Sequence, residues 1–584
     1  MNDEQPVEFT DKLSWSISVW TWLTGERLLY CALALLGLII RLAGLGHWPL
    51  RPDEAANALA AWRFLHPTGW QPAAYSPLLV NTEIILFWIT RAGEFSVRLL
   101  PALAGASLVL LPSLWRKELG RIGALVVAGL LVLSPSFLTF SRAADGALLA
   151  SAGCAWAGTI LYRVCVSGQP KRLSLAMLPL GLALTASSNS YTWLIAAVLL
   201  GGAYYLLSNI EKRITLRTWL TIILNRQALL ILGATWVLAA TAGFINLQGV
   251  GQAVALPWRW LQGITSIAPP FGWYGLGRNL LVYEPLLVLL AAYSVFISFR
   301  RRRTLTLWLL AWFGCSLVLT WLTSAGQTSW IVDPLWPLLW LAGWGTQALW
   351  DTIGPRACTM DLVVLSPLAA LLIFSFIELV AYGRVPDKYL LIYALVGLLL
   401  TLIAWFGYWL WSDRRSAMRV GASLILAILL LYTIRSSSTL LYQTGADPRE
   451  GFFRQPTSIA IRDLEAFISA TSSHQARDAH ALSISYPANL EPLLGWSLRD
   501  YPRSGDLSDS STLTTTAVIL PLASEAERPR GYIGQRFTLY ERFTQPNLPL
   551  RDLVRWFVMR QPVGVIERDQ VEFWLRPPSE NTLP

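Results

Sequence analysis

Long apolar runs recur from about residue 28 to residue 441, and they constrain the fold more than any other feature of the chain. A helix of roughly 17 to 25 apolar residues matches a hydrocarbon core about 30 Å thick. Apolar residues make up 54% of the 584 residues and charged residues only 14%, which excludes a soluble globular protein. We therefore predict an all-α polytopic membrane protein with about 13 transmembrane helices: 28–46, 98–115, 122–140, 144–163, 173–189, 191–208, 228–246, 280–299, 304–323, 330–350, 362–382, 389–411 and 420–441.

The basic residues predict the orientation of these helices. Lys and Arg exceed Asp and Glu by 46 to 36, and much of the excess lies in short loops between apolar runs, which is typical of membrane topology and not of a nucleic-acid partner. The basic loops all lie on one side of the membrane only if the short run Pro77–Thr90 does not cross the bilayer. We therefore predict a re-entrant or interfacial helix there, with a cytoplasmic N-terminal segment. The predicted segments are 1–27 (cytoplasmic), 28–442 (membrane module, with exterior loops 47–97 and 247–279) and 443–584 (exterior).

The exterior tail differs in composition, being rich in Arg, Ser, Thr, Asp and Pro. Helical and strand-like patterns alternate along it, which favours a small α/β domain. The predicted helices are 457–469 and 553–559, and the predicted strands are 481–485, 517–520, 563–566 and 571–575.

Two adjacent carboxylates, Asp53 and Glu54, follow the first predicted span directly. Carboxylates beside a membrane cost desolvation energy unless they are solvated or paired, so their presence requires an explanation. One explanation is structural: Pro52 suits a helix start, and acidic residues in the first turn favour the helix dipole. The other is a functional site.

Arg142 and Asp145 lie on the same predicted exterior side, between the third and fourth spans. A structural explanation exists here too, because an interfacial Arg extends towards headgroups and Asp145 suits a helix N-cap. An Arg close to carboxylates at the bilayer surface is also what binding a lipid phosphate and deprotonating an acceptor require. The sequence leaves both alternatives open.

Four stretches carry a family resemblance: Arg51-Pro-Asp-Glu-Ala, Tyr75-Ser-Pro-Leu-Leu, the segment Gly93–Gly105, and Leu133–Asp145. Together they are similar to the GT-C superfamily of membrane glycosyltransferases, in its protein O-mannosyltransferase and aminoarabinose-transferase branch. Within it, the chain most resembles the prokaryotic flippase activity-associated proteins, whose exterior tail has a stretch similar to Pro492–Tyr501.

This resemblance implies an inverting transfer of a sugar from a polyprenyl-phosphate donor to a glycan, protein or lipid acceptor at the plasma membrane. It implies Asp53 as the general base and Glu54 as its neighbour or an acceptor ligand, with Arg142, Asp145 and Arg278 as the second half of the site. Donors of this kind commonly need no cofactor. If a divalent ion such as Mg²⁺ or Mn²⁺ takes part, its ligands are expected to be Asp53, Glu54 and Asp145.

The chain departs from the family at one position, since relatives often carry a histidine where it has Ala74-Tyr75-Ser76. Further candidate site residues are Tyr75 in this stretch, Glu83, which could compensate for the histidine, and Glu284, which could lie at the exterior interface close to the donor. The missing histidine also keeps a second function open, a non-enzymatic accessory or flippase-associated component of lipid-linked glycan assembly. A secondary transporter is disfavoured because no inverted repeat is visible.

Overall fold

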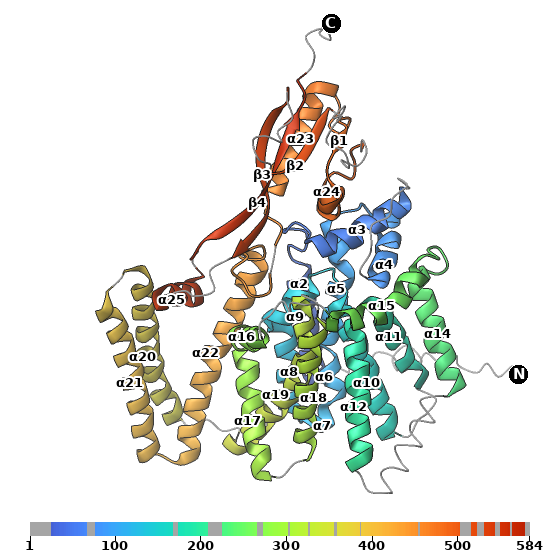
Figure 1. Cartoon of the computed structure of the whole chain (residues 1–584). Helices are drawn as coiled ribbons and strands as arrows, with labels where there is room; N and C mark the ends of the chain where they lie inside the picture. Colours follow the sequence, from blue (N-terminus) through green and yellow to red (C-terminus); the bar gives the residue numbers. More distant parts are fainter. Residues whose placement is uncertain are drawn as a thin grey trace, which may run out of the picture.

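The fold was analysed in a computed structural model. It describes residues 25–66, 76–167, 173–207, 225–265, 273–301, 304–324, 327–354, 359–385, 387–453, 456–502, 516–522, 531–543, 549–560 and 563–577. Helices make up one large body, and a small sheet stands at one end of it (Figure 1).

The chain is a multi-pass membrane protein. Seven helices in the described ranges are long and apolar enough to cross a bilayer, or up to nine if each of two bent pairs is one span. In five of them no more than 22% of the residues of the apolar stretch are buried, which leaves the others available for lipid contact. The seven are α5 with its continuation (Glu94–Leu114), α10 (Ala147–Ser167), α12 (Asn189–Leu207), α18 (Thr304–Thr323), α20 (Met360–Arg384), α21 (Lys388–Trp411) and α22 (Arg414–Tyr442).

The predicted count of 13 spans is not confirmed. Helices α8 (Arg121–Leu133) and α9 (Pro135–Ser141) meet at 53°, and α16 (Trp273–Tyr283) and α17 (Pro285–Arg301) meet at a still sharper bend. A proline starts the second helix of each pair, where its ring interrupts the backbone hydrogen bonds. Helices α11 (Leu173–Ala186) and α14 (Arg226–Thr241) are apolar but shorter. The helical body also contains α2 (Gly25–Leu42), α15 (Gly249–Thr265) and α19 (Val332–Ile353).

The run predicted as re-entrant or interfacial forms α4 (Pro77–Ile89), a helix of 13 residues. At 1.5 Å per residue it is roughly 20 Å long, less than the ~30 Å of a hydrocarbon core. It packs beside α3 (Pro52–Leu65), and both lie at the end of the bundle that carries the sheet (Figure 1).

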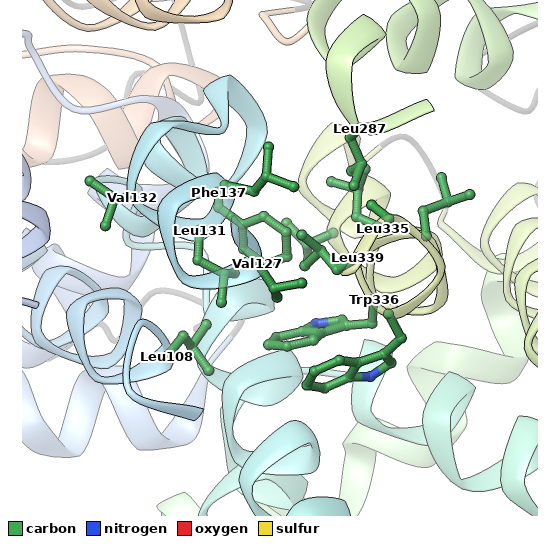
Figure 2. Packing of buried hydrophobic residues seen from close by; sticks show 14 of the residues in the cluster. Leu108, Val127, Leu131, Val132, Phe137, Leu287, Leu335, Trp336 and Leu339 are labelled. Atoms are coloured by element: carbon green, nitrogen blue, oxygen red, sulfur yellow. The ribbon is translucent and has the colours of Figure 1, made fainter. Parts of the chain in front are cut away.

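The main core of the bundle lies between α8, α17 and α19. Figure 2 shows Val127 and Leu131 of α8 facing Leu335 and Leu339 of α19. The two helices approach closely, because a Cβ atom at Gly123 would lie 2.3 Å from the backbone oxygen of Gly343. In lipid the hydrophobic effect does not drive helices together, so the close van der Waals packing at such glycines stabilises their association.

The C-terminal domain, which the basic loops predict to be exterior and which is called the exterior domain below, has a four-stranded sheet in the order β1-β2-β4-β3. Only its β1–β2 pair is parallel. The predicted α/β composition is therefore correct, although two details were wrong. Strand β3 was missed because most of its side chains are exposed or half-buried. Of the predicted strand 563–566, only Ile566 lies in a strand, as the first residue of β4. The elements are α23 (Ile461–Ala476), β1 (Ile484–Ser485), α24 (Glu491–Ser497), β2 (Ala517–Pro521), β3 (Ile533–Phe543), α25 (Leu550–Met559) and β4 (Ile566–Leu575).

Helix α24, which contains much of the family-like stretch, connects this domain to the membrane module. Its Trp496 ring lies 5.9 Å from the ring of Phe87 on α4. Its Glu491 forms a buried ion pair with Arg63 on α3. The domain and the helices α3 and α4 thus share one apolar core, which holds α3 in place.

Candidate active site

The site begins at the first turn of α3. Arg51 is the N-cap residue, and its backbone N–H donates to the Glu54 carboxylate at 2.9 Å, in a capping box. Pro52 takes the first helical position, where a missing N–H costs nothing. The structural explanation of the acidic pair is therefore correct for Glu54.

Glu54 is buried and accepts four hydrogen bonds. Besides Arg51, the donors are Nε and Nη2 of Arg98, at 3.1 and 2.7 Å, and the backbone N–H of Ala144, at 2.8 Å. Burial alone would raise the pKa of Glu54, but the charges of Arg98 and Arg51 outweigh it and lower the pKa to about 2. A carboxylate so fully occupied is an anchor and a very weak base.

This anchor joins two distant parts of the sequence. Ala144 precedes Asp145, and its backbone oxygen also accepts a hydrogen bond from Asn57 on α3, at 3.1 Å. The start of α3 and the connection between α9 and α10 are thereby fixed side by side. The two charged clusters singled out in the sequence lie at the same end of the bundle.

Between these segments lies a cavity of about 130 Å³. Asp53 and Asp145 both line it, with Arg51 between them. The remaining lining comes from the first residue of α3, from the turn before α19 and from the segment that leads into the exterior domain: Pro52, Gln327, Thr328, Ser329, Phe452, Phe453 and Pro456.

The two carboxylates in the cavity differ in environment. Asp145 is 5% exposed and accepts from the backbone N–H of Ala147 at 3.0 Å. Burial raises the pKa of Asp145 to about 6, with the charge of Asp53 adding to the rise and Arg51 opposing it. The side chain of Asp53 is 33% exposed, and its closest cation is Arg51 Nε, at 3.7 Å. Asp53 is therefore the more accessible of the two.

Arg51 is the cation of the cavity. Its Nη2 donates to Asp145 at 3.4 Å, and its side chain is 17% exposed. Burial lowers the pKa of Arg51, but the charges of Asp53, Glu54 and Asp145 together raise it above the ordinary value. The guanidinium therefore stays charged and keeps donor positions that face the cavity.

The chain resembles known proteins in fold but not in sequence. No protein-family model and no curated protein matches the sequence. The crystal structure of ArnT from Cupriavidus metallidurans bound to undecaprenyl phosphate matches 95% of this chain and 100% of its own, with a TM-score of 0.54 and 14% identity. The chain has a GT-C fold.

Two further solved structures are similar. The apo structure of the same ArnT covers 83% of this chain and 86% of its own, with a TM-score of 0.49 and 14% identity. The arabinosyltransferase EmbB from Mycobacterium smegmatis covers 74% of this chain and 42% of its own, with a TM-score of 0.40 and 15% identity. ArnT and EmbB are both GT-C membrane glycosyltransferases.

Arg142, which the resemblance placed at the donor phosphate, is engaged with the backbone. Its Nη1 donates to the oxygens of Ile40 and Ala43, at 2.9 and 2.6 Å, and its Nη2 to that of Gly44, at 2.8 Å. It thus stabilises the C-terminal end of α2, whose last carbonyls lack partners within the helix. It also lines a recess of about 50 Å³ beside the main cavity of this GT-C fold, together with Arg51.

The other candidates lie away from the main cavity. Arg278 on α16 is exposed and is not part of its lining. Glu284 is buried at the break between α16 and α17, where it accepts from the backbone N–H of Ser136 at 3.0 Å and so caps α9. Glu83 is buried on α4, with no hydrogen-bond partner among the described residues. Tyr75 lies outside the described residues.

The residues do not fit a metal ion. Within the described ranges, no group of three or more His, Cys, Asp or Glu side chains is arranged to hold one. Of the three carboxylates expected as ligands, Glu54 already has four donors, and Arg51 lies between the other two.

The sequence analysis missed two residues of the site. Arg51 was quoted for its place in a motif and received no role. Arg98 was treated as the start of a span, although an Arg at the edge of an apolar run is a signal that a buried partner exists. The polar residues 327–329 carried no signal, because only the fold brings them to the cavity.

Proposed function

We propose that this chain is a glycosyltransferase that moves a sugar from a polyprenyl-phosphate donor to an acceptor hydroxyl on the extracytoplasmic face of the plasma membrane. The observation that carries the proposal is the cavity in which Asp53, Asp145 and Arg51 meet, at the sheet-bearing end of a GT-C fold. The ArnT structure of the same fold was solved with undecaprenyl phosphate bound, which supports a donor of this class.

Asp53 is the proposed general base, because it is accessible and has an oxygen without a close partner among the described residues. Its carboxylate takes the proton of the acceptor hydroxyl as that oxygen attacks the anomeric carbon of the sugar. The bond between this carbon and the phosphate oxygen breaks, and the phosphate leaves with the electron pair. Attack from the face opposite the phosphate inverts the anomeric centre.

Arg51 is the proposed partner of the leaving phosphate. A charge-assisted contact from a guanidinium stabilises the negative charge that develops there, so no proton donor is required. Asp145 acts through Arg51, since its carboxylate holds the Arg51 Nη2 at 3.4 Å. It is therefore a positioning residue, and Glu54 fixes α3 for both.

The test is transfer by the purified full-length protein from a panel of polyprenyl-phosphate sugars. Asp53→Asn should lower the rate by about 10²- to 10⁴-fold, the usual contribution of a general base. Asp500→Asn is the matched control, because Asp500 is an exposed aspartate of the exterior domain. An Asp53→Asn variant with wild-type activity would contradict the proposal.

The alternative is an accessory component of lipid-linked glycan assembly, and the absence of a histidine at 74–76 favours it. It would be supported if the wild-type protein transferred no sugar from any donor while glycan export in cells still required it. Export that tolerates Asp53→Asn would point the same way.

A further inference from the structure

A second and larger cavity, of about 320 Å³, lies between α10, α12, α18 and α19. The short helix α7 (Arg116–Leu119) forms one edge of it. Its lining is dominated by six tryptophans: Trp115, Trp193, Trp312, Trp336, Trp340 and Trp344.

This cavity lies far from the one that contains Asp53. Cys154 and Tyr162 of α10 line it, and at 1.5 Å per residue they lie roughly 13 and 25 Å further along the helix than Asp145. The buried Asp333 stands between the two cavities on α19, where it accepts from Trp193 Nε1 at 2.8 Å. The tryptophan cavity therefore belongs to the half of the bundle away from the exterior domain.

The indole N–H groups are largely occupied by the protein. Trp115 donates to Thr159 at 3.0 Å, Trp336 to Ser151 at 2.7 Å, and Trp344 to the backbone oxygen of Glu118 at 2.7 Å, in addition to the Trp193 bond above. Four of the six indoles thus present their carbon faces to the cavity. A sugar, which needs hydrogen-bond partners, would find few here, whereas a hydrocarbon chain needs none.

The size of the cavity also favours a chain. An apolar cavity of about 150 Å³ in an engineered protein stays dry and takes up benzene. This one is about twice that volume, and its lining would lose dispersion contacts if nothing filled it. A segment of a lipid tail fits both its volume and its chemistry.

Basic side chains surround the α7 edge. Arg116, Lys117, Arg121 and Arg163 are all exposed there. Arg116 and Arg121 share a single carboxylate, Glu26, at 2.6 and 3.3 Å. The four cations exceed the nearby acidic residues, Glu26 and Glu118, so this edge attracts an anionic headgroup.

We infer that the tryptophan cavity binds one acyl chain of an anionic phospholipid, whose phosphate lies at the basic edge formed by Arg116, Lys117 and Arg163. The lipid belongs to the leaflet opposite the exterior domain, so it is distinct from the proposed sugar donor. The inference does not depend on the transferase proposal, because it rests on a different cavity.

Gly158 offers a way to fill the cavity without disturbing its walls. It lines the cavity, and a Cβ atom there would meet nothing within 4 Å. Gly158→Phe should therefore place a ring where the lipid chain lies. Gly201→Phe is the matched control, since Gly201 of α12 has the same free space and does not line the cavity.

The experiment uses the full-length protein in nanodiscs that contain phosphatidylglycerol with a photoreactive diazirine in one acyl chain. After irradiation, mass spectrometry should find the label on peptides with Cys154–Tyr162 and Trp336–Trp344. Gly158→Phe should remove this labelling, and Gly201→Phe should retain it. Lys117→Gln should lower it by about fivefold, the contribution of one basic residue near an anionic headgroup.

Three results would overturn the inference. Labelling that Gly158→Phe leaves unchanged would exclude the cavity as the site. Equal labelling by phosphatidylcholine with the same photoreactive chain would exclude an anionic lipid. Displacement of the label by equimolar undecaprenyl phosphate, but not by unlabelled phosphatidylglycerol, would assign the cavity to a polyprenyl chain instead. Lys117 is exposed, so its variant tests the headgroup even if Gly158→Phe does not fold.

Discussion

Two cavities lie along the same pair of helices, α10 and α19, and their chemistry is opposite. The first, just before the start of both helices, contains Arg51, Asp53 and Asp145. The second, further along them, is lined mainly by tryptophans. Helix starts expose backbone N–H groups and adjoin loops, so charged side chains find partners there. Within the bundle the backbone groups are already hydrogen-bonded inside each helix. A binding site there is therefore formed by side chains alone.

The largest effect should come from Glu54, the anchor beside the charged cavity. Glu54→Gln leaves the buried Arg98 without its counter-charge, which should lower the free energy of unfolding by about 3–5 kcal/mol. Thermal unfolding in detergent measures this, with Asp53→Asn as the neighbouring control whose melting temperature should stay close to wild type. Equal melting temperatures for Glu54→Gln and Asp53→Asn would show that the two carboxylates do not differ in role.

A pH titration should separate the two cavities. The folded-state pKa of Asp145 is raised to about 6, above the ~3.9 of an unfolded chain, so the folded state holds the proton more tightly. Its stabilising contribution is complete below pH 4 and is lost as pH rises through 6, by about 3 kcal/mol in total.

The melting temperature of wild type relative to Asp145→Asn should therefore fall between pH 4 and pH 7. A variant of the tryptophan cavity, Gly158→Ala, should follow the wild-type profile throughout. Parallel profiles for wild type and Asp145→Asn would contradict the assignment of this titration to Asp145.

The Arg51 contact should have a smaller effect. Arg51→Lys keeps the charge but loses the forked donors, and a charge-assisted hydrogen bond contributes about 1.5–3 kcal/mol. Transfer should thus slow by roughly 10- to 100-fold, measured as initial rate from the polyprenyl-phosphate donor. Arg568→Lys, on β4 and outside both cavities, should be neutral, because the Arg568 side chain is exposed. If Arg51→Lys left the transfer rate unchanged, the phosphate would have to be bound by another cation.

The smallest effect tests how tightly each region is packed. Gly158→Ala at the tryptophan cavity should raise stability by about 1 kcal/mol, because alanine favours a helix over glycine and nothing obstructs its methyl group. Gly146→Ala, next to Asp145, should do the opposite. Gly146 has a φ of +84°, and its Cβ atom would lie 2.3 Å from the backbone oxygen of Ala186. If Gly146→Ala were more stable than Gly158→Ala in thermal unfolding, the proposed difference in packing between the two regions would be wrong.

Much of the architecture was predictable from the sequence, because hydrophobicity is a local property. A helix occurs in each predicted apolar run, and the exterior tail is an α/β domain. The span count was not confirmed, since prolines at 135 and 285 begin helices at sharp angles to those before them. Strand β3 buries only Phe537 and Leu539 among its 11 residues, so its pattern carried little signal.

By itself, the sequence determined that this protein is embedded in a membrane. It also determined that acidic and basic residues follow the first and third apolar runs. Only the tertiary structure separated Asp53 from Glu54, which are neighbours with the same chemistry. Arg98 and Ala144, distant in sequence, saturate one carboxylate and leave the other open to the cavity. Hydrogen-bond partners depend on which segments the fold brings together, and no local pattern specifies them.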